Sequence, residues 1–321
     1  MTNPRFERFP FDVLRHLDFP GSLGDDIRAL RPWSMIPPYP WGQWTYGRLY
    51  RARCRKLAGD VAEFGVGLGG MSIFLGRLAQ RDGKRLWSFD SFEGLPPPDP
   101  EQDNRYFQTG DYGLHPARNT SLRARFDALV ARTDLKDTIR VRQGFFEETL
   151  PRLPKRSRLS FVHIDADLYS SVLTVLEHVY DRVVDGGVIA IDDYFHHAQG
   201  PARAVSTFFR RRGVDAVFHI ALPYSVVIIK GERPRRAMRP CLDGQLYSVD
   251  LLRADRELSR AVEQSVRRAR GTEASEPARQ FRSLLERTQD SSADLYVFQQ
   301  TFAAFWDLFA SGPTERTKIL L

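Results

Sequence analysis

The feature that most constrains the fold of this chain is a regular alternation of short apolar runs with helical patterns. Seven runs rich in β-branched and aromatic residues predict strands, at residues 60–65, 85–90, 139–144, 159–165, 187–192, 216–221 and 225–229. Helical patterns lie between them, at residues 71–80, 122–132, 171–180 and 202–211. Parallel strands need crossover connections, and these helices supply them. The alternation therefore predicts an α/β fold with a doubly wound, mostly parallel sheet that helices cover on both faces.

The chain changes character after its last two predicted strands. Pro223 lies in the short connection between those strands and predicts an antiparallel hairpin at the end of the sheet. Residues 231–240 are rich in Arg and Pro and predict a linker. We therefore expect one domain at residues 1–235, including an N-terminal lid region, and an α-helical C-terminal extension at residues 241–321.

The predicted extension carries an apolar stripe. Its members step by 3, 4, 3 and 4 residues, as one face of a helix does, at Leu295, Phe298, Phe302, Phe305 and Phe309. Such a stripe packs on the protein's own helices or forms a dimer or membrane-surface contact, and the sequence leaves both interpretations open.

Composition excludes several classes of protein. The 321 residues include 47 Lys and Arg against 40 Asp and Glu, a net charge of +7, and 42% are hydrophobic, as in globular proteins. The two cysteines, Cys54 and Cys241, exclude a disulfide scaffold and a Cys-rich zinc module. Basic residues are spread along the chain, so we expect no nucleic-acid partner. No apolar run reaches the roughly 18 residues that span a bilayer, and charges interrupt the first residues. We therefore expect no transmembrane segment, no signal peptide and a cytoplasmic location.

A glycine-rich turn follows the first predicted strand directly. Its residues are Glu63, Phe64, Gly65, Val66, Gly67, Leu68, Gly69 and Gly70. Glycine lets the backbone turn sharply and approach a ligand, and Ser72 lies in the next helix's first turn, where free N–H groups face outward. Asp90 ends the second strand 27 residues after Glu63, where a carboxylate can accept hydrogen bonds from both ribose hydroxyls. The turn predicts a nucleoside cofactor, with tight strand–helix packing as the alternative.

The spacing of this turn discriminates between two cofactors. Dinucleotide sites use Gly-x-Gly-x-x-Gly to bring a pyrophosphate to a helix N-terminus. Here the spacing is Gly-x-Gly-x-Gly, and Glu63 lies two residues before the first glycine. A carboxylate there repels a pyrophosphate but suits the ammonium group of a methionine moiety. The pattern favours S-adenosylmethionine (SAM) over NAD.

Acidic residues follow the fourth and fifth predicted strands. Asp165 and Asp167 come at the end of the fourth strand, and Asp192 and Asp193 at the end of the fifth. The carboxyl ends of neighbouring parallel strands lie on one side of a sheet, so Asp165, Asp192 and Asp193 can converge. Converging carboxylates raise one another's pKa unless a cation joins them, and oxygen ligands suit Mg²⁺, Ca²⁺ or Mn²⁺. The alternative is that individual aspartates cap the next helices.

Five segments occur together in the order typical of one family. They are residues 63–70, 88–96, 144–151, 163–169 and 191–194. Over residues 30–230 the chain resembles the macrocin-type (TylF/MycF-like) O-methyltransferases. The resemblance implies a class I SAM-methyltransferase fold, Rossmann-like, with a seven-stranded sheet. It also implies a SAM- and Mg²⁺-dependent enzyme that methylates sugar hydroxyls in antibiotic biosynthesis.

The resemblance assigns roles to individual residues. It implies that Asp165, Asp192 and Asp193 bind the metal. It implies a SAM pocket formed by Met35, Glu63, Gly65, Gly67, Gly69, Ser72, Asp90, Ser91, Gln143, Gly144 and Asp165. Met35 corresponds to an N-terminal flap, and Gln143 and Gly144 lie near the adenine.

The sequence departs from the resembled enzymes at the general base. Those enzymes place an aspartate two residues past the tyrosine that matches Tyr194, whereas the nearest position here, Phe195, is apolar. His196 and His197 follow, and an unperturbed histidine pKa of about 6.5 suits proton abstraction at neutral pH. Two surface histidines are the alternative, and Asp167 is a third candidate base.

These inferences together predict methyl transfer from SAM to a hydroxyl of a sugar or other vicinal diol. A hard divalent cation would bind two adjacent oxygens of the diol and lower the pKa of one. We also expect a homo-oligomer. Three alternatives stay open: a catechol or other phenol as acceptor, a non-catalytic SAM- or nucleotide-binding module, and an NAD-linked oxidoreductase.

Overall fold

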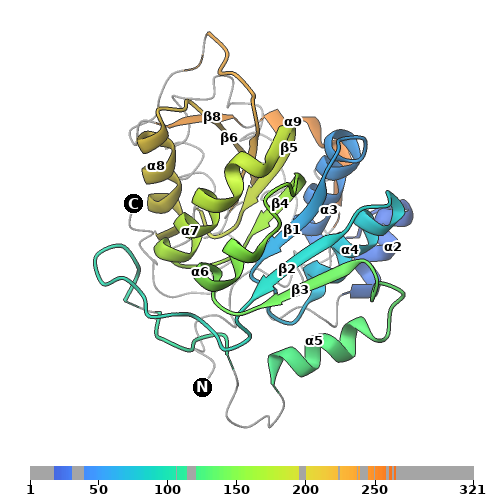
Figure 1. The fold of residues 1–321 in the computed structure, drawn as a ribbon. Helices are drawn as coiled ribbons and strands as arrows, with labels where there is room; N and C mark the ends of the chain where they lie inside the picture. The colour runs from blue at the N-terminus through green and yellow to red at the C-terminus, as the bar shows by residue number, and fades with distance from the viewer. Residues whose placement is uncertain are drawn as a thin grey trace, which may run out of the picture.

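The computed structural model describes residues 18–30, 40–105, 107–113, 121–194, 200–222, 225–236, 238, 245–248, 250–257, 260, 261 and 264. Their centre is a single sheet with the strand order β3-β2-β1-β4-β5-β7-β6-β8 (Figure 1). The strands are β1 (Asp60–Phe64), β2 (Leu86–Asp90), β3 (Ile139–Gln143), β4 (Leu159–Ile164), β5 (Val183–Ile191), β6 (Val217–Leu222), β7 (Ser225–Ile229) and β8 (Leu246–Ser248). β7 pairs antiparallel with both β5 and β6, while the other pairings are parallel. The α/β prediction and the terminal hairpin are confirmed.

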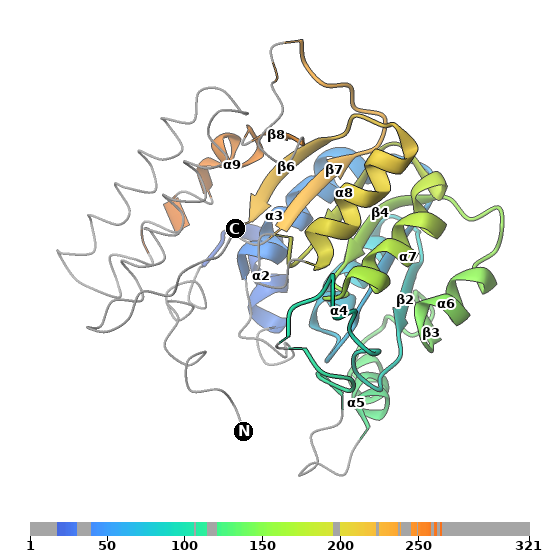
Figure 2. The ribbon, with the colours of Figure 1, turned by 90° about the vertical axis from the view of Figure 1, so that its left-hand side faces the viewer.

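Helices cover both faces of the sheet. They are α2 (Gly21–Leu30), α3 (Pro40–Leu49), α4 (Gly70–Arg81), α5 (Leu122–Val130), α6 (Phe146–Thr149), α7 (Tyr169–Val179), α8 (Gly200–Arg212) and α9 (Asp250–Ala254). A π-helical turn, Tyr50–Cys54, continues α3. Figures 1 and 2 show α6, α7 and α8 on one face, and α2, α3 and α4 on the other.

The core lies where these layers meet the central strands. All six residues of β4 are buried, which is usual for a strand covered on both faces. Phe64 and Phe161 are fully buried at the centre, and each contributes roughly 2–3 kcal/mol by leaving water. On α7, Val172, Val175 and Leu176 form the buried face that the sequence period indicates. No helix in the described ranges is long and apolar enough to cross a membrane.

The sheet has eight strands, one more than the predicted seven. The additional strand, β8, pairs in parallel with β6, with Phe218 opposite Tyr247. A strand of three residues after an Arg- and Pro-rich stretch is too short to leave a periodic pattern. Most of residues 241–321, including the apolar stripe, lie outside the described residues, so the helical extension and its boundary stay predictions.

The connectivity creates a switch point between two central strands. From β1 the chain proceeds outward to β2 and β3, and then returns to β4 on the other side of β1. Helices on either side of such a point leave a crevice beyond the carboxyl ends of the strands, where doubly wound sheets bind ligands. Glu63 lies near the end of β1, and Asp165 directly follows β4. These two predicted site residues therefore lie at the switch point.

Candidate active site at the switch point

A row of polar side chains crosses the carboxyl ends of three strands. Glu63 of β1 is in register with Ser88 of β2 and with His163 of β4, so the three side chains lie on one face of the sheet. All three are buried, at 1% exposure or less. Ser72, from the first turn of α4, donates a hydrogen bond to Glu63 Oε2. The row thus faces the layer formed by α3 and α4.

The glycine turn between β1 and α4 requires glycine for two separate reasons. Gly65 has φ +90°, and a Cβ there would overlap the carbonyl oxygen of Asp165. Gly69 has φ +91°, and a Cβ there would overlap the Phe126 ring of α5. Side chains at these positions would be strained and would collide with neighbours. Gly65 therefore seats the turn directly against the acidic end of β4.

Asp90 fixes this turn from the end of β2. Its Oδ2 accepts hydrogen bonds from the backbone N–H groups of Val66, at 2.6 Å, and Gly67, at 3.0 Å. Its Oδ1 accepts from Phe92 N–H at 2.6 Å. A carboxylate has about four acceptor positions, so one is left for a ligand hydroxyl. The Ser91 hydroxyl accepts from Glu93 N–H and donates to the Gly94 carbonyl.

The two residues predicted near the adenine lie beside this turn. Gly144 N–H donates to the Asp90 carbonyl at 3.0 Å. The exposed Gln143 accepts a hydrogen bond from Arg123 at 3.2 Å through Oε1. The ends of β1, β2 and β3 are thus joined by backbone hydrogen bonds.

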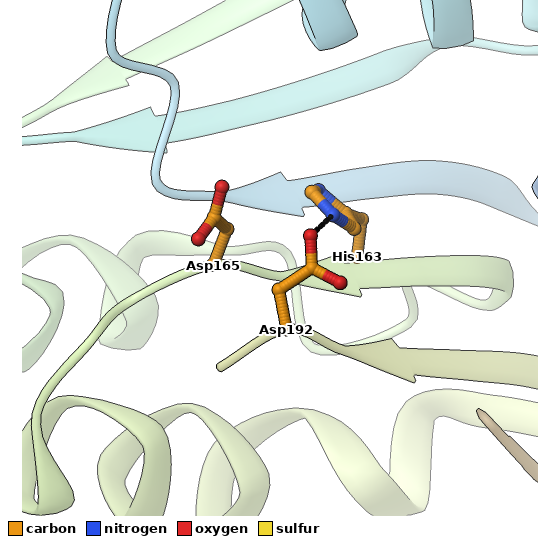
Figure 3. Close-up of side chains that lie close together, drawn as sticks. All are labelled: His163, Asp165 and Asp192. Carbon is orange, nitrogen blue, oxygen red and sulfur yellow. Dashed lines mark hydrogen bonds and ion pairs between the residues drawn. The ribbon is translucent and has the colours of Figure 1, made fainter. Parts of the chain in front are cut away.

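A cluster of metal-ligand type lies at the ends of β4 and β5. His163, Asp165 and Asp192 each offer a ligand atom, and these atoms lie within 4.8 Å of one another. Figure 3 shows Asp192 turned toward the His163 ring, with Asp165 beside them. Asp165 is exposed, whereas Asp192 is 8% exposed and His163 is 1% exposed. The cluster is thus open to a ligand on the Asp165 side and closed on the other.

Buried donors hold both oxygens of the Asp192 carboxylate. His163 Nε2 lies 3.1 Å from Oδ2. The Tyr46 hydroxyl, from α3, donates to Oδ1 and lies 3.0 Å from the hydroxyl of Ser225 at the start of β7. Sequence analysis missed His163 and Tyr46 as site residues. The single ionisable residue in a buried strand, His163, was a usable signal, whereas no sequence pattern marked Tyr46.

Two further aspartates have unusual backbone conformations. Asp167 has φ +56° and Asp193 has φ +57°, a left-handed region that non-glycine residues seldom adopt. Strained conformations cluster at functional sites because the surrounding structure must hold them. Asp193 interacts with Asp167 by a side-chain hydrogen bond, and its carboxylate lies outside the His163–Asp165–Asp192 cluster. The structure therefore brings together two of the three predicted metal ligands and places the third one beside them.

The acids of this site carry an excess of negative charge, which His163 offsets in part. Asp165 keeps solvent access but is surrounded by protein, and this loss of hydration, followed by the charges of Asp192 and Asp193, raises its pKa well above the ordinary value. Burial, and then the charge and hydrogen bond of Asp193, raise the pKa of Asp167 in the same way. A cation between these groups would remove the repulsion.

Glu63 and His163 have perturbed pKa values for different reasons. Burial raises the pKa of Glu63 to about 7, although His163 and Ser72 act against this shift. Burial would lower the pKa of His163, but the charge and hydrogen bond of Asp192 outweigh it and raise the pKa to about 9. Perturbed groups of this kind concentrate in functional sites.

The residues fit both a hard divalent cation and SAM. The carboxylates of Asp165 and Asp192 are oxygen donors whose repulsion a cation relieves, as Mg²⁺ or Mn²⁺ sites require. Glu63 Oε1 and His163 Nδ1 lie 3.9 Å apart, and both are buried without a hydrogen-bond partner among the described residues. An orphaned carboxylate oxygen next to the glycine turn suits an ammonium group. Met35, His196 and His197 lie outside the described residues, so their predicted roles stay predictions.

Comparison with known proteins identifies the family. Residues 49–222 match the profile of the macrocin-O-methyltransferase (TylF) family. The 8-demethyl-8-(2,3-dimethoxy-α-L-rhamnosyl)-tetracenomycin-C 4'-O-methyltransferase of Streptomyces olivaceus is 35% identical over 142 residues, 42% of this chain and 53% of the relative. The mycinamicin III 3''-O-methyltransferase of Micromonospora griseorubida is 34% identical over 148 residues, 42% of this chain and 55% of the relative. The chain thus matches little more than half the length of these relatives.

A solved structure supports the fold assignment. The O-methyltransferase NovP superposes with a TM-score of 0.50 at 23% sequence identity, covering 65% of this chain and 98% of NovP. The common fold is the class I, Rossmann-like methyltransferase fold that the sequence predicts. With the family profile matching more than half of its residues, this chain belongs to the macrocin-O-methyltransferase (TylF) family.

Proposed function

We propose that this protein is a SAM-dependent, divalent-metal-dependent O-methyltransferase. Its acceptor would be a hydroxyl of a sugar or other vicinal diol, in natural-product biosynthesis such as that of antibiotics. The site has a donor half, formed by Glu63, the glycine turn and Asp90, and an acidic half, formed by the aspartates that follow β4 and β5. The observation that carries the proposal is the contact between these two halves. Gly65 of the glycine turn lies against Asp165, which shares a cluster with Asp192. A methyl donor on the turn and a cation on the cluster would therefore be neighbours.

The family relatives support the acceptor class. Their printed names describe methylation of a rhamnosyl group on tetracenomycin, of mycinamicin III and, in Streptomyces niveus, of demethyldecarbamoylnovobiocin. We extend the sugar hydroxyl to this chain as part of the proposal. The cytoplasmic location and the homo-oligomeric state stay predictions.

The residues of the glycine turn and its neighbours would bind the donor. Glu63 Oε1 would accept a hydrogen bond from the ammonium group, and Asp90 has an acceptor position left for a ribose hydroxyl. Gly65 and Gly67 let the backbone approach the donor closely. Because Asp90 already holds the turn through two amides, the pocket is formed before the donor arrives.

The acidic half would bind the cation and the acceptor. When bound, SAM supplies an electrophilic methyl group, and a divalent cation lowers the pKa of an acceptor hydroxyl. Asp165 and Asp192 would hold the cation, and Asp192 is kept in place by Tyr46 and His163. Alignment of the acceptor oxygen with the methyl group supplies much of the acceleration.

The proton of the acceptor hydroxyl needs a base. Asp167 lies in this half of the site, and its raised pKa makes it a better base than an ordinary carboxylate. His196 and His197 are the other candidates. Retention of activity in Asp167→Asn with loss in His196→Gln or His197→Gln would assign the base to a histidine, and the reverse would assign it to Asp167.

The proposal is tested by following S-adenosylhomocysteine (SAH) production with an acceptor panel. Mycinamicin III and methyl α-L-rhamnoside represent sugars, and catechol represents vicinal phenols. We expect product with at least one sugar, loss of activity with EDTA and recovery with Mg²⁺. Exclusive methylation of catechol would replace the acceptor class. Binding of SAM without turnover on any acceptor, or stabilisation by NAD but not SAM in thermal denaturation, would contradict the proposal.

A further inference from the structure

The acidic cluster has a contact from outside the residues that define the family. Tyr46 lies on α3, before the matched range of residues 49–222, and its hydroxyl donates to Asp192 Oδ1. Tyr46 is fully buried, and its ring lies 5.3 Å from the His163 ring between centroids. The other oxygen of Asp192 contacts His163 at 3.1 Å. Asp192 therefore has one oxygen held by the sheet and the other by α3.

The position of α3 is fixed by close packing on its inner side. Gly47 lies next to Tyr46, and a Cβ there would come within 2.7 Å of Leu23 on α2 and 2.8 Å of Phe74 on α4. The Tyr46 ring packs edge-on against Phe161 of β4, at 6.2 Å between centroids. A larger residue at position 47 would force the Leu23 or Phe74 side chain to shift, so glycine allows α3 to pack closely where the Tyr46 hydroxyl meets Asp192.

Residues near the C-terminal end of the described chain hold the outer side of α3. Trp44 Nε1 donates to Asp255 Oδ2 at 3.1 Å, and Asp255 is 8% exposed. Arg48, one turn along α3, lies 3.5 Å from the same oxygen and also pairs with Glu257. Phe19 stacks on Trp44 at 4.4 Å between centroids. Asp255 follows α9 and also lies outside the matched range of the family.

We propose that Tyr46 is a positioning residue for the metal ligand Asp192, and that Asp255 keeps Tyr46 in place through Trp44 and Arg48. The inference rests on the proposed metal site and assigns a purpose to two segments that the family match omits. Tyr46 does not itself bind the metal or the donor. Its hydroxyl fixes the rotation of the carboxylate, so that the orientation of Asp192 is already set when the cation arrives.

The physical reason is the cost of orienting a charged ligand. A carboxylate that is free to rotate loses entropy when it coordinates a metal, whereas one held by two donors has lost that freedom on folding. Groups that hydrogen-bond to metal ligands typically change metal affinity by 10- to 100-fold when removed. The glycine turn has its own support from Asp90, which does not involve Tyr46 or Asp192. Loss of the Tyr46 hydroxyl should therefore weaken metal binding and leave the affinity for the donor unchanged.

The chain offers a matched control for this test. Tyr50 lies four residues after Tyr46, is equally buried, and packs edge-on against the same Phe161 ring at 6.1 Å. Its hydroxyl is directed to the carbonyl of Leu78, 3.4 Å away, rather than to the acidic cluster. Tyr46→Phe and Tyr50→Phe thus remove the same atom from the same layer, and only one of the two atoms contacts Asp192.

The experiment measures Mn²⁺ affinity by electron paramagnetic resonance and SAH affinity by calorimetry, on the full chain. We expect Tyr46→Phe to bind Mn²⁺ about 10- to 100-fold more weakly than wild type, with SAH affinity within about twofold. Tyr50→Phe should leave both affinities unchanged. Asp255→Asn should weaken Mn²⁺ binding in the same direction and by less, because it acts through α3.

The outcomes separate the inference from the function on which it rests. A wild-type protein that binds no Mn²⁺ overturns the metal site and the inference with it. Wild-type Mn²⁺ affinity in Tyr46→Phe, or an equal loss in Tyr50→Phe, overturns the inference and leaves the metal site in place. If Tyr46→Phe does not fold, as judged by thermal denaturation, Asp255→Asn decides: weaker Mn²⁺ binding supports the inference, and unchanged binding overturns it.

Discussion

The two halves of the site differ in the groups that form them: backbone groups in the donor half and side chains in the acidic half. At the ends of β1 and β2 the structure uses backbone: glycines with positive φ angles, in a turn whose Val66 and Gly67 amides donate to Asp90. At the ends of β4 and β5 it uses side chains, and the pKa values of Asp165 and Asp167 there are raised. The glycine turn of the first half is held by hydrogen bonds within the protein, whereas the repulsion among the acids of the second half would be relieved by the proposed cation.

Under the proposed function, this difference would allow one sheet edge to hold two ligands of like charge. A sulfonium donor and a divalent cation are both positive and would repel each other in a shared pocket. In the proposal, Glu63 would face the donor and the Asp165–Asp192 pair would face the cation, with His163 between them. If this account is right, a substitution in one half should leave ligand binding by the other half unchanged, except at residues where the two halves are in contact.

The largest effect is expected where the halves touch. Gly65→Ala would place a Cβ against the Asp165 carbonyl at φ +90°, so the turn and the β4 end must both move. We expect a loss of several kcal/mol in the free energy of unfolding, with loss of both SAH and Mg²⁺ binding. The measurement is urea denaturation together with calorimetric titration of each ligand.

Gly83→Ala is the matched control for this prediction. Gly83 has φ +67°, but a Cβ there meets no atom within 4 Å, so the substitution introduces backbone strain without a collision. It should cost about 1–2 kcal/mol and leave both ligands bound. Equal effects of the two substitutions would show that Gly65 serves the turn alone and does not join the halves.

The next largest effect is expected for a substitution that changes only the acidic half. Asp192→Asn keeps the shape of the side chain but removes its charge, so Mg²⁺ binding should be lost and turnover should fall by at least about 100-fold. SAH affinity should stay within about twofold. Asp181→Asn, at an exposed acid paired with Arg212, should change neither quantity. A parallel loss of SAH binding in Asp192→Asn would contradict the division into two halves.

A smaller effect is expected for a substitution that changes only the donor half. Glu63→Gln removes the negative charge that faces the donor's ammonium group while keeping a hydrogen bond to Ser72 within reach. SAH affinity should fall by about tenfold, and Mg²⁺ affinity should stay close to that of wild type. Titration calorimetry measures both. A larger loss of Mg²⁺ than of SAH affinity would place Glu63 in the acidic half instead.

The smallest effect is a pH dependence of stability. The folded state raises the pKa of His163 from 6.5 to about 9, so this group contributes stability that is fully present below pH 6.5 and is lost as the pH rises through 9. We expect the free energy of unfolding of the metal-free protein to fall by a few kcal/mol at most between pH 6.5 and 9. Urea denaturation in EDTA measures it, and His163→Gln should have a flatter profile. A profile that rises with pH, or equal slopes in both proteins, would refute this assignment.

Much of this fold could be predicted because its signals are local. The apolar runs and the glycine turn place β1 to β4 within one or two residues of the structure. β5 begins earlier than predicted, at Val183, because Asp185, Gly186 and Gly187 interrupt the apolar pattern inside a strand that still pairs with β4. β8 is too short to produce a pattern at all.

The positions of site residues could be predicted only for those that end a strand or directly follow one. Asp165 and Asp192 follow neighbouring strands, and topology alone brings them together. Asp193 interacts with Asp167 instead and has a left-handed backbone conformation, which a strand pattern does not encode. Tyr46 reaches Asp192 across 146 positions of the chain, through the packing of α3 on the sheet.

The claim that a divalent cation joins the ends of β4 and β5 beside a donor on the glycine turn has a direct test. Crystals grown with SAH and soaked in Mn²⁺ would be measured for anomalous scattering at the manganese edge. We predict one strong peak within coordination distance of Asp165 and Asp192, with SAH against Gly65. A peak elsewhere, or SAH bound with no peak at these two aspartates, would contradict the account.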